Sequence, residues 1–285
     1  SFMNTKTKFS IFTSAVAVSG SAQEVCDAYE DACLFGSLDI KAAAAGAAKR
    51  AQMLLSGESV KTGTYNLLVP PAAACELLSV LAPVFSAANI IKGKSFLINF
   101  KPGSAAASEA LSLRDDALLD YRAGSYSADS EGTPGSNKVL IEKGILKGFL
   151  SDRLSAAILG IRPSGNAVRH SFKSMPEPGP SNFYIQPGKR KAKEAMKRFS
   201  GIIVNSFMGL HTADPVSGNF SLGINGFMSS GGKIKGAVKE ALASGNMEKL
   251  LENVREVCSD LKFYSNFGSP TIIISDIMLS GSKKQ

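Results

Sequence analysis

The sequence contains no tryptophan, only two histidines and only four cysteines among its 285 residues. No pair of cysteines has Cys-x-x-Cys spacing, which excludes the common zinc-finger frameworks. The cysteines fall in apolar or helical stretches, so reduced thiols fit this pattern better than a disulfide scaffold. No secretory signal peptide is visible in the sequence. We therefore expect a cytoplasmic protein.

The sequence also lacks a convincing membrane span. The nearest candidate is residues 71–91, but it contains Glu76, Pro83 and Asn89, each of which would be costly against lipid. A buried helix explains this run better. The hydrophobic content of 44% is enough for a substantial core, and the length is acceptable for one large domain. We expect a single globular domain with no membrane partner.

Positive charge is concentrated in one place. The net charge is +8, and residues 189–198 alone hold six basic residues and one acidic residue. Apolar residues recur in and just after this stretch at the spacing of one helix face. They are Ala192, Ala195, Met196 and Phe199. The lysines of such a helix point into water, and no aromatic residues alternate with them to stack on bases. We therefore do not expect this stretch to bind nucleic acid. Nucleic-acid binding is kept as a third alternative function, beside the two given below.

The hydrophobic pattern predicts many strands and few helices. A loosely alternating run at residues 5–18 predicts a first strand, and Ser37 can cap a helix over residues 38–55. A strand at residues 65–69 precedes a helix opened by Pro70-Pro71. Further strands are predicted at residues 96–100, 139–141, 145–150, 183–186, 202–207, 220–228 and 271–275, and a last helix at residues 247–261. Without regular βαβ alternation, this order predicts an α+β fold with mostly antiparallel, partly barrel-like sheets and a few packed helices.

One of the two histidines lies in an unusual turn. Residues 208–223 read MGLHTADPVSGNFSLG, which places His211 directly before a predicted strand. In one interpretation the turn is structural, and Asp214 and Ser217 bond the local backbone. A catalytic triad with Asp214 and a serine is another, but the chain has no G-x-S-x-G elbow.

The amino-acid sequence of this turn resembles a characteristic motif of the TldD/PmbA family, the so-called modulators of DNA gyrase. The resemblance is specifically to its PmbA (TldE) branch. Segments with the same resemblance occur in the same order along the chain. They are residues 61–65, 132–134, 139–150, 164–169, 180–188, 260–263 and 268–270. The resemblance implies one C-terminal-type domain over residues 1–285. The family's usual N-terminal α/β domain has no counterpart here, as in an expressed fragment or a truncated relative.

The resemblance also implies that a metal motif has been lost. In the TldD branch the helix after the first central strand carries HExxxH, whose histidines hold zinc and whose glutamate acts as the base. The corresponding stretch here has Cys75 and Val80 at the histidine positions and keeps Glu76. The region comparable to the family's C-terminal cysteine ligand, residues 266–270, has no cysteine. We therefore expect no metal, no cofactor and no catalytic residue in this chain, since a glutamate without a metal does not activate water in that way.

The function implied by the resemblance is that of a TldE/PmbA-like subunit. Such a subunit pairs with a TldD-like partner, which supplies the zinc of a metalloprotease that acts on extended peptides. Two polar turns at strand ends are the expected substrate-binding segments. Their residues are Asn166, Arg169, His211, Asp214 and Ser221. The main alternative is a non-enzymatic homodimer that binds peptides or another ligand.

Overall fold

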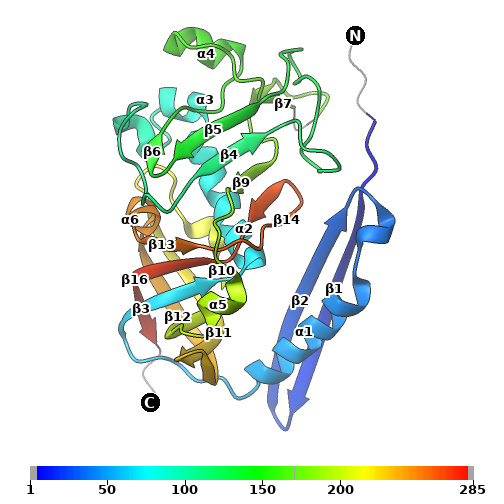
Figure 1. Cartoon of the computed structure of the whole chain (residues 1–285), viewed down its shortest axis with the longest axis vertical. Helices are drawn as coiled ribbons and strands as arrows, with labels where there is room; N and C mark the ends of the chain where they lie inside the picture. Colours follow the sequence, from blue (N-terminus) through cyan, green and yellow to red (C-terminus); the bar gives the residue numbers. More distant parts are fainter. Residues whose placement is uncertain (1–4, 170, 282–285) are drawn as a thin grey trace.

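The computed structural model describes residues 5–169 and 171–281. Two six-stranded sheets form the body of the molecule, and a two-stranded hairpin with its own helix stands beside them (Figure 1). Most strand pairs are antiparallel, and the parallel pairs include β3 with β10 and β9 with β15. The predicted α+β class with mostly antiparallel sheets is confirmed.

The first sheet closes on itself. Its strand order is β12-β11-β10-β3-β16-β13, and β12 also pairs with β16, so five strands form a barrel with β13 attached to it. The strands are β3 (Gly63–Val69), β10 (Gly201–Met208), β11 (Asn219–Ser230), β12 (Lys233–Asn246), β13 (Val254–Val257) and β16 (Ile272–Gly281). Alternating apolar side chains such as Ile202 and Val204 are buried in the main core. The expected barrel-like character is therefore confirmed.

The second sheet is built from short strands. They are β4 (Leu113–Asp116), β5 (Asn137–Glu142), β6 (Ile145–Leu146), β9 (Phe183–Ile185), β14 (Lys262–Tyr264) and β15 (Phe267–Ser269), and a ribbon of β7 (Ala167–Val168) and β8 (Glu177–Pro178) lies nearby. The hairpin of β5 and β6 turns at Lys143 and Gly144, as predicted. Both turn residues have positive φ, 46° and 80°, which suits a tight hairpin turn.

Helix α2 (Pro71–Leu81) runs through the centre of the molecule and contacts strands of both sheets. Pro71 is tolerated at its first position because that N–H has no helical partner. The run that could have been mistaken for a membrane span is broken into α2, the 3-10 turn η2 (Ala82–Phe85) and α3 (Ala87–Ile91). In the described part of the chain, no helix is long and apolar enough to cross a membrane.

The hairpin consists of β1 (Phe9–Ser19) and β2 (Ala22–Ala32), and α1 (Ile40–Leu54) covers one of its faces. The buried side of α1 is built mostly from alanine, which lets the helix lie close to the strands. A cluster that includes Cys26, Leu54, Ile203 and Phe227 joins this unit to the barrel. The hairpin and its helix are therefore packed against the barrel through this cluster.

Remaining helices and turns are short. They are α4 (Arg153–Leu159), α5 (Ala192–Met196), α6 (Met247–Glu252), η1 (Phe35–Ser37), η3 (Phe96–Asn99) and η4 (Leu210–Thr212). The basic stretch thus forms a helix of only five residues. Its Arg190 pairs with Glu256 at 2.8 Å.

Several predicted elements were wrong. The helix over residues 247–261 ends at Glu252, because Val254 and Val257 pair with β16 as strand β13. Cys258 therefore follows a strand and does not lie on a helix. The strand predicted at residues 96–100 is absent, because Phe96–Asn99 form the 3-10 turn η3.

The cap of the first long helix was also misplaced. Asp39, not Ser37, caps α1, since its carboxylate accepts the N–H of Ala42 at 2.9 Å. The predicted helix therefore exists, with a start two residues further along the chain than expected.

Candidate functional site

A cleft of about 1060 Å³ lies between the hairpin and the body. One wall comes from β2 and α1, and the other from the start of α2, β10, β14 and β15. Figure 1 shows β2 as the hairpin strand nearer to the body. This volume is slightly above the range of about 300–1000 Å³ that is typical of ligand pockets. The cleft is therefore the main candidate binding site.

Polar contacts hold β2 to the body at both ends of the strand. Near its start, the Glu24 carboxylate pairs with Lys239 of β12. Near its end, Lys262 of β14 pairs with Glu30, and the N–H of Ser265 donates to the Asp31 carboxylate at 2.7 Å. These tethers fix the separation of the two walls.

Two unpaired strand edges line the cleft. Strand β10 pairs with β11 along its length, but it pairs with β3 only at Ile202 and Ile203. Among the described residues, no strand pairs with the second side of residues 204–208, and all five line the cleft. In residues 5–169 and 171–281, β2 pairs with β1 alone. Unpaired edges offer backbone N–H and C=O groups to an extended chain.

Glu76 lies at the edge of β10. Helix α2 places its carboxylate so that Oε2 accepts the backbone N–H of Phe207 at 3.1 Å. Burial raises the pKa of Glu76, and the hydrogen bond from Phe207 opposes this by favouring the charged form. Glu76 thus satisfies one N–H at the edge of β10 through Oε2 and leaves Oε1 without a hydrogen-bond partner among the described residues.

Cys75 is a neutral thiol in this environment. Its Sγ lies 3.3 Å from the carbonyl oxygen of Phe267, and burial raises the pKa of the thiol to about 12. Metal ions bind the thiolate, so this setting works against coordination. Val80, at the position of the second histidine, lines a separate apolar cavity of about 50 Å³. The residues at the motif positions therefore do not fit a zinc ion.

Residues 5–169 and 171–281 hold no group of three or more histidine, cysteine, aspartate or glutamate residues placed to bind a metal ion. His170 lies outside the described residues.

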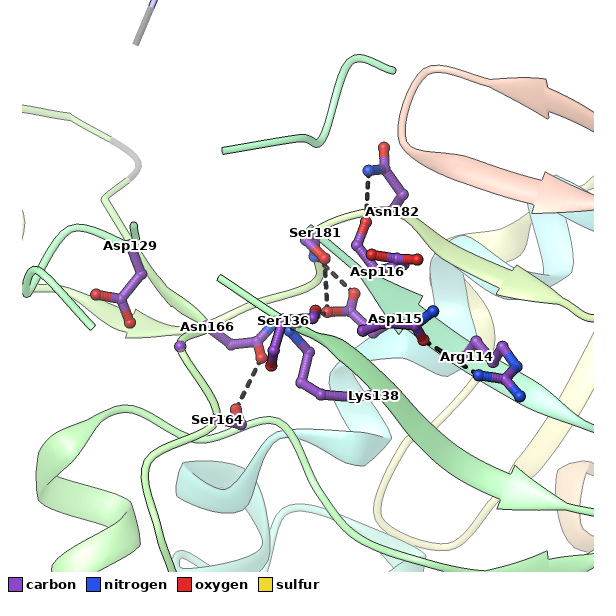
Figure 2. Close-up of polar contacts among 12 residues, drawn as sticks. Arg114, Asp115, Asp116, Asp129, Ser136, Lys138, Ser164, Asn166, Ser181 and Asn182 are labelled. Carbon is purple, nitrogen blue, oxygen red and sulfur yellow. Dashed lines mark hydrogen bonds and ion pairs between the residues drawn. The ribbon is translucent and has the colours of Figure 1, made fainter. Parts of the chain in front are cut away.

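Asn166 is part of a buried polar network, not of the cleft (Figure 2). Its Nδ2 donates to Asp115 at 2.8 Å, and its Oδ1 accepts from Ser164 at 2.7 Å. Asp115 also accepts from the backbone and hydroxyl of Ser181 and lies 3.3 Å from the Lys138 ammonium. Asn166 and Asp115 are both 0% exposed. The network ties the loop before β7 to β4, β5 and the loop before β9.

The second expected segment forms a surface turn. The Asp214 carboxylate accepts from Val216 N–H and from the N–H and hydroxyl of Ser217, and these bonds lower the pKa of Asp214. His211 in η4 and Ser221 on β11 are exposed. The structural interpretation of this turn is therefore the geometry that is observed.

The five expected binding residues do not come together in the cleft. Arg169 is exposed and donates to the carbonyl of Ser174 at 3.0 Å. None of the five lines the cleft wall. A contact between these segments and a peptide stays a prediction that depends on a partner subunit.

Sequence reasoning missed several residues of the cleft. Asn205 sits at a β-bulge in β10, and its amide donates to Asn225 at 3.0 Å and lies 3.9 Å from Cys26 of β2. A sign of this bulge was present in the sequence, since the polar pair Asn205-Ser206 interrupts an otherwise apolar strand. Arg50 of α1, also in the wall, had no such signal because its place depends on the packing of α1.

Comparison with known proteins agrees with this fold. Residues 62–281 match the family model of the PmbA/TldA metallopeptidase C-terminal domain. A metalloprotease TldD homolog of Buchnera aphidicola is 34% identical over 62% of this chain and 37% of its own length. The chain therefore spans little more than a third of that curated relative.

Two crystal structures are similar over nearly the whole chain. One is TldE from Thermococcus kodakarensis, with a TM-score of 0.87 and 27% identity over 96% of this chain and 63% of that one. The other, from Thermotoga maritima, is named for modulation of DNA gyrase and has a TM-score of 0.88 and 27% identity over 95% and 62%. By sequence, fold and family match, the chain belongs to the PmbA/TldD family.

Proposed function

We propose that this chain is a PmbA/TldE-like subunit that lacks its own zinc site. It contributes, as one C-terminal-type domain, to a cytoplasmic TldD/TldE-type metalloprotease that processes extended peptides. The observation that carries the proposal is the cleft beside Glu76. It is lined by α2, which holds the altered motif, and by the unpaired edges of β10 and β2. The partner subunit supplies the metal and the reacting water.

The cleft suits an extended peptide. A peptide lying along residues 204–208 of β10, or along β2, bonds through its main chain, so binding tolerates different sequences. The tethers at Glu24 and at Asp31 keep the walls apart without a peptide. A preformed site of this kind loses less entropy on binding than one that must first open.

The altered motif supports a role without chemistry of its own. Glu76 keeps the carboxylate of the family's base, but Cys75 and Val80 leave no imidazole beside it. Zinc, where a family member binds it, polarises the attacked carbonyl and lowers the pKa of bound water. Glu76 instead holds the Phe207 N–H of the cleft wall.

Co-purification tests the proposal. The chain, carrying an affinity tag, is expressed together with the TldD-type protein of the same genome and recovered on the tag. We expect a stable complex with one partner chain per copy. Recovery of the chain alone, with a homodimer mass in solution, would support the alternative of a non-enzymatic peptide- or ligand-binding homodimer.

A further inference from the structure

Five charged residues line the cleft, and three of them have no ion-pair partner among the described residues. They are Asp27, Glu30, Arg50, Glu76 and Lys262. Glu30 pairs with Lys262, and the Asp27 carboxylate accepts the Ser14 hydroxyl. No ion pair involves Asp27, Arg50 or Glu76 in the described residues. Of these three, Arg50 and Glu76 carry opposite charges, lie on different elements and are therefore both available to one ligand.

These two charges belong to different walls. Arg50 projects from α1, on the hairpin side, and one of its nitrogens donates to the carbonyl of Asp27 at 2.8 Å. That bond anchors the guanidinium beside β2 and leaves further N–H groups unused. Glu76 belongs to α2, on the body side, with Oε1 unused. A ligand that satisfies both groups must carry an anion at one end and a cation at the other.

A short peptide with free ends has this charge pattern. A guanidinium binds a carboxylate through two parallel N–H bonds, and a carboxylate oxygen accepts from an ammonium group. We propose that the cleft selects short peptides with free ends, with the α-ammonium at Glu76 and the α-carboxylate at Arg50. The proposal rests on the proposed peptide-binding function and adds that the ligand is an oligopeptide, not an internal segment of a long chain.

The test compares peptides that differ only at their ends. One sequence is prepared in a length series in four forms: free, N-acetylated, C-amidated and blocked at both ends. Affinity for the purified chain is measured by calorimetry. At the best length, each block is expected to weaken binding about tenfold, as the loss of a charge-assisted hydrogen bond in a partly buried site does.

Variants assign each end to a residue. Glu76→Gln should remove the cost of acetylation and keep the cost of amidation, and Arg50→Gln should do the reverse. A purely structural role of either side chain would weaken all four forms equally. Glu109→Gln and Arg162→Gln are matched controls, since both residues are exposed and lie outside the cleft wall, and they should change none of the affinities.

The outcomes separate this inference from the proposed function. If peptides of every length and form bind equally well, the cleft binds peptides without recognising their terminal charges, and the inference is wrong. If no form binds, both fail. The comparison of blocked and free peptides uses the unmodified chain, so it stays decisive even where a variant does not fold.

Discussion

The Glu76 carboxylate accepts the N–H of Phe207 at 3.1 Å, and this bond joins helix α2 to the free edge of β10. Without it, an N–H of the cleft wall would have no protein partner beside a large cavity. In the proposed function, this glutamate completes the wall of the peptide-binding cleft. The same carboxylate keeps a second oxygen for the ligand.

Asp115 should be important for stability. Its replacement by alanine removes the only ion-pair partner that Lys138 has among the described residues and an acceptor of Asn166 and Ser181, at a site where the aspartate itself is 0% exposed. We expect Asp115→Ala to lower the free energy of unfolding by about 3–5 kcal/mol, the range for removing one member of a buried pair. Urea unfolding measures this. Asp120→Ala, at an exposed position, is the control and should change stability by less than about 0.5 kcal/mol.

Gly144 should resist substitution. It has a φ of 80°, and a Cβ there would lie 2.4 Å from the carbonyl oxygen of Ala107. We expect Gly144→Ala to cost at least about 1–2 kcal/mol from the left-handed backbone alone. Thermal unfolding against Gly148→Ala gives the comparison, since no atom lies within 4 Å of a Cβ at Gly148. Equal stability of the two variants would contradict the observed turn.

The isolated chain should bind no stoichiometric zinc. Cys75, with its pKa raised to about 12, stays protonated at neutral pH, so a metal would first have to displace the thiol proton. The expected result of elemental analysis after dialysis is well below one zinc per chain. One zinc per chain, lost on replacement of Cys75 by serine, would show that the motif still coordinates a metal.

Duplex DNA should bind weakly and without a steep salt dependence. If the basic stretch contacted about five phosphates, the logarithm of the affinity would fall with the logarithm of salt concentration with a slope near about −4.5. Arg190 is already paired with Glu256 and is less available for such contacts. Anisotropy titrations at several salt concentrations test this. A slope of that size, abolished by Lys191→Glu together with Lys193→Glu, would favour the nucleic-acid alternative.

Local signals predicted much of the fold. The Lys143-Gly144 turn, the start of α2 at Pro71 and the apolar strand β10 each follow from residues close together in sequence. Strands β2 and β12 were not predicted, because β2 is rich in acidic residues and β12 in alanine and glycine. Their strand character comes from pairing with β1, β11 and β16, which a local pattern does not reveal.

The site was harder to predict than the fold. The resemblance led to Cys75 and Glu76, which do line the cleft. It also led to Asn166, whose polar neighbours turned out to be buried partners. Arg50 and Asn205 come from segments far apart in sequence, and only the docking of the hairpin brings them to one cleft. A single sequence holds no signal for that docking.

Peptide cleavage by the purified chain, with and without a TldD-type partner, tests the central claim most directly. We predict no cleavage by the chain alone, and cleavage by the complex that a chelator such as EDTA removes and added zinc restores. His211→Ala should reduce turnover or peptide affinity in the complex if its turn faces the shared chamber. Cleavage by the chain alone in the presence of EDTA would contradict the assignment of this chain as the subunit without a zinc site.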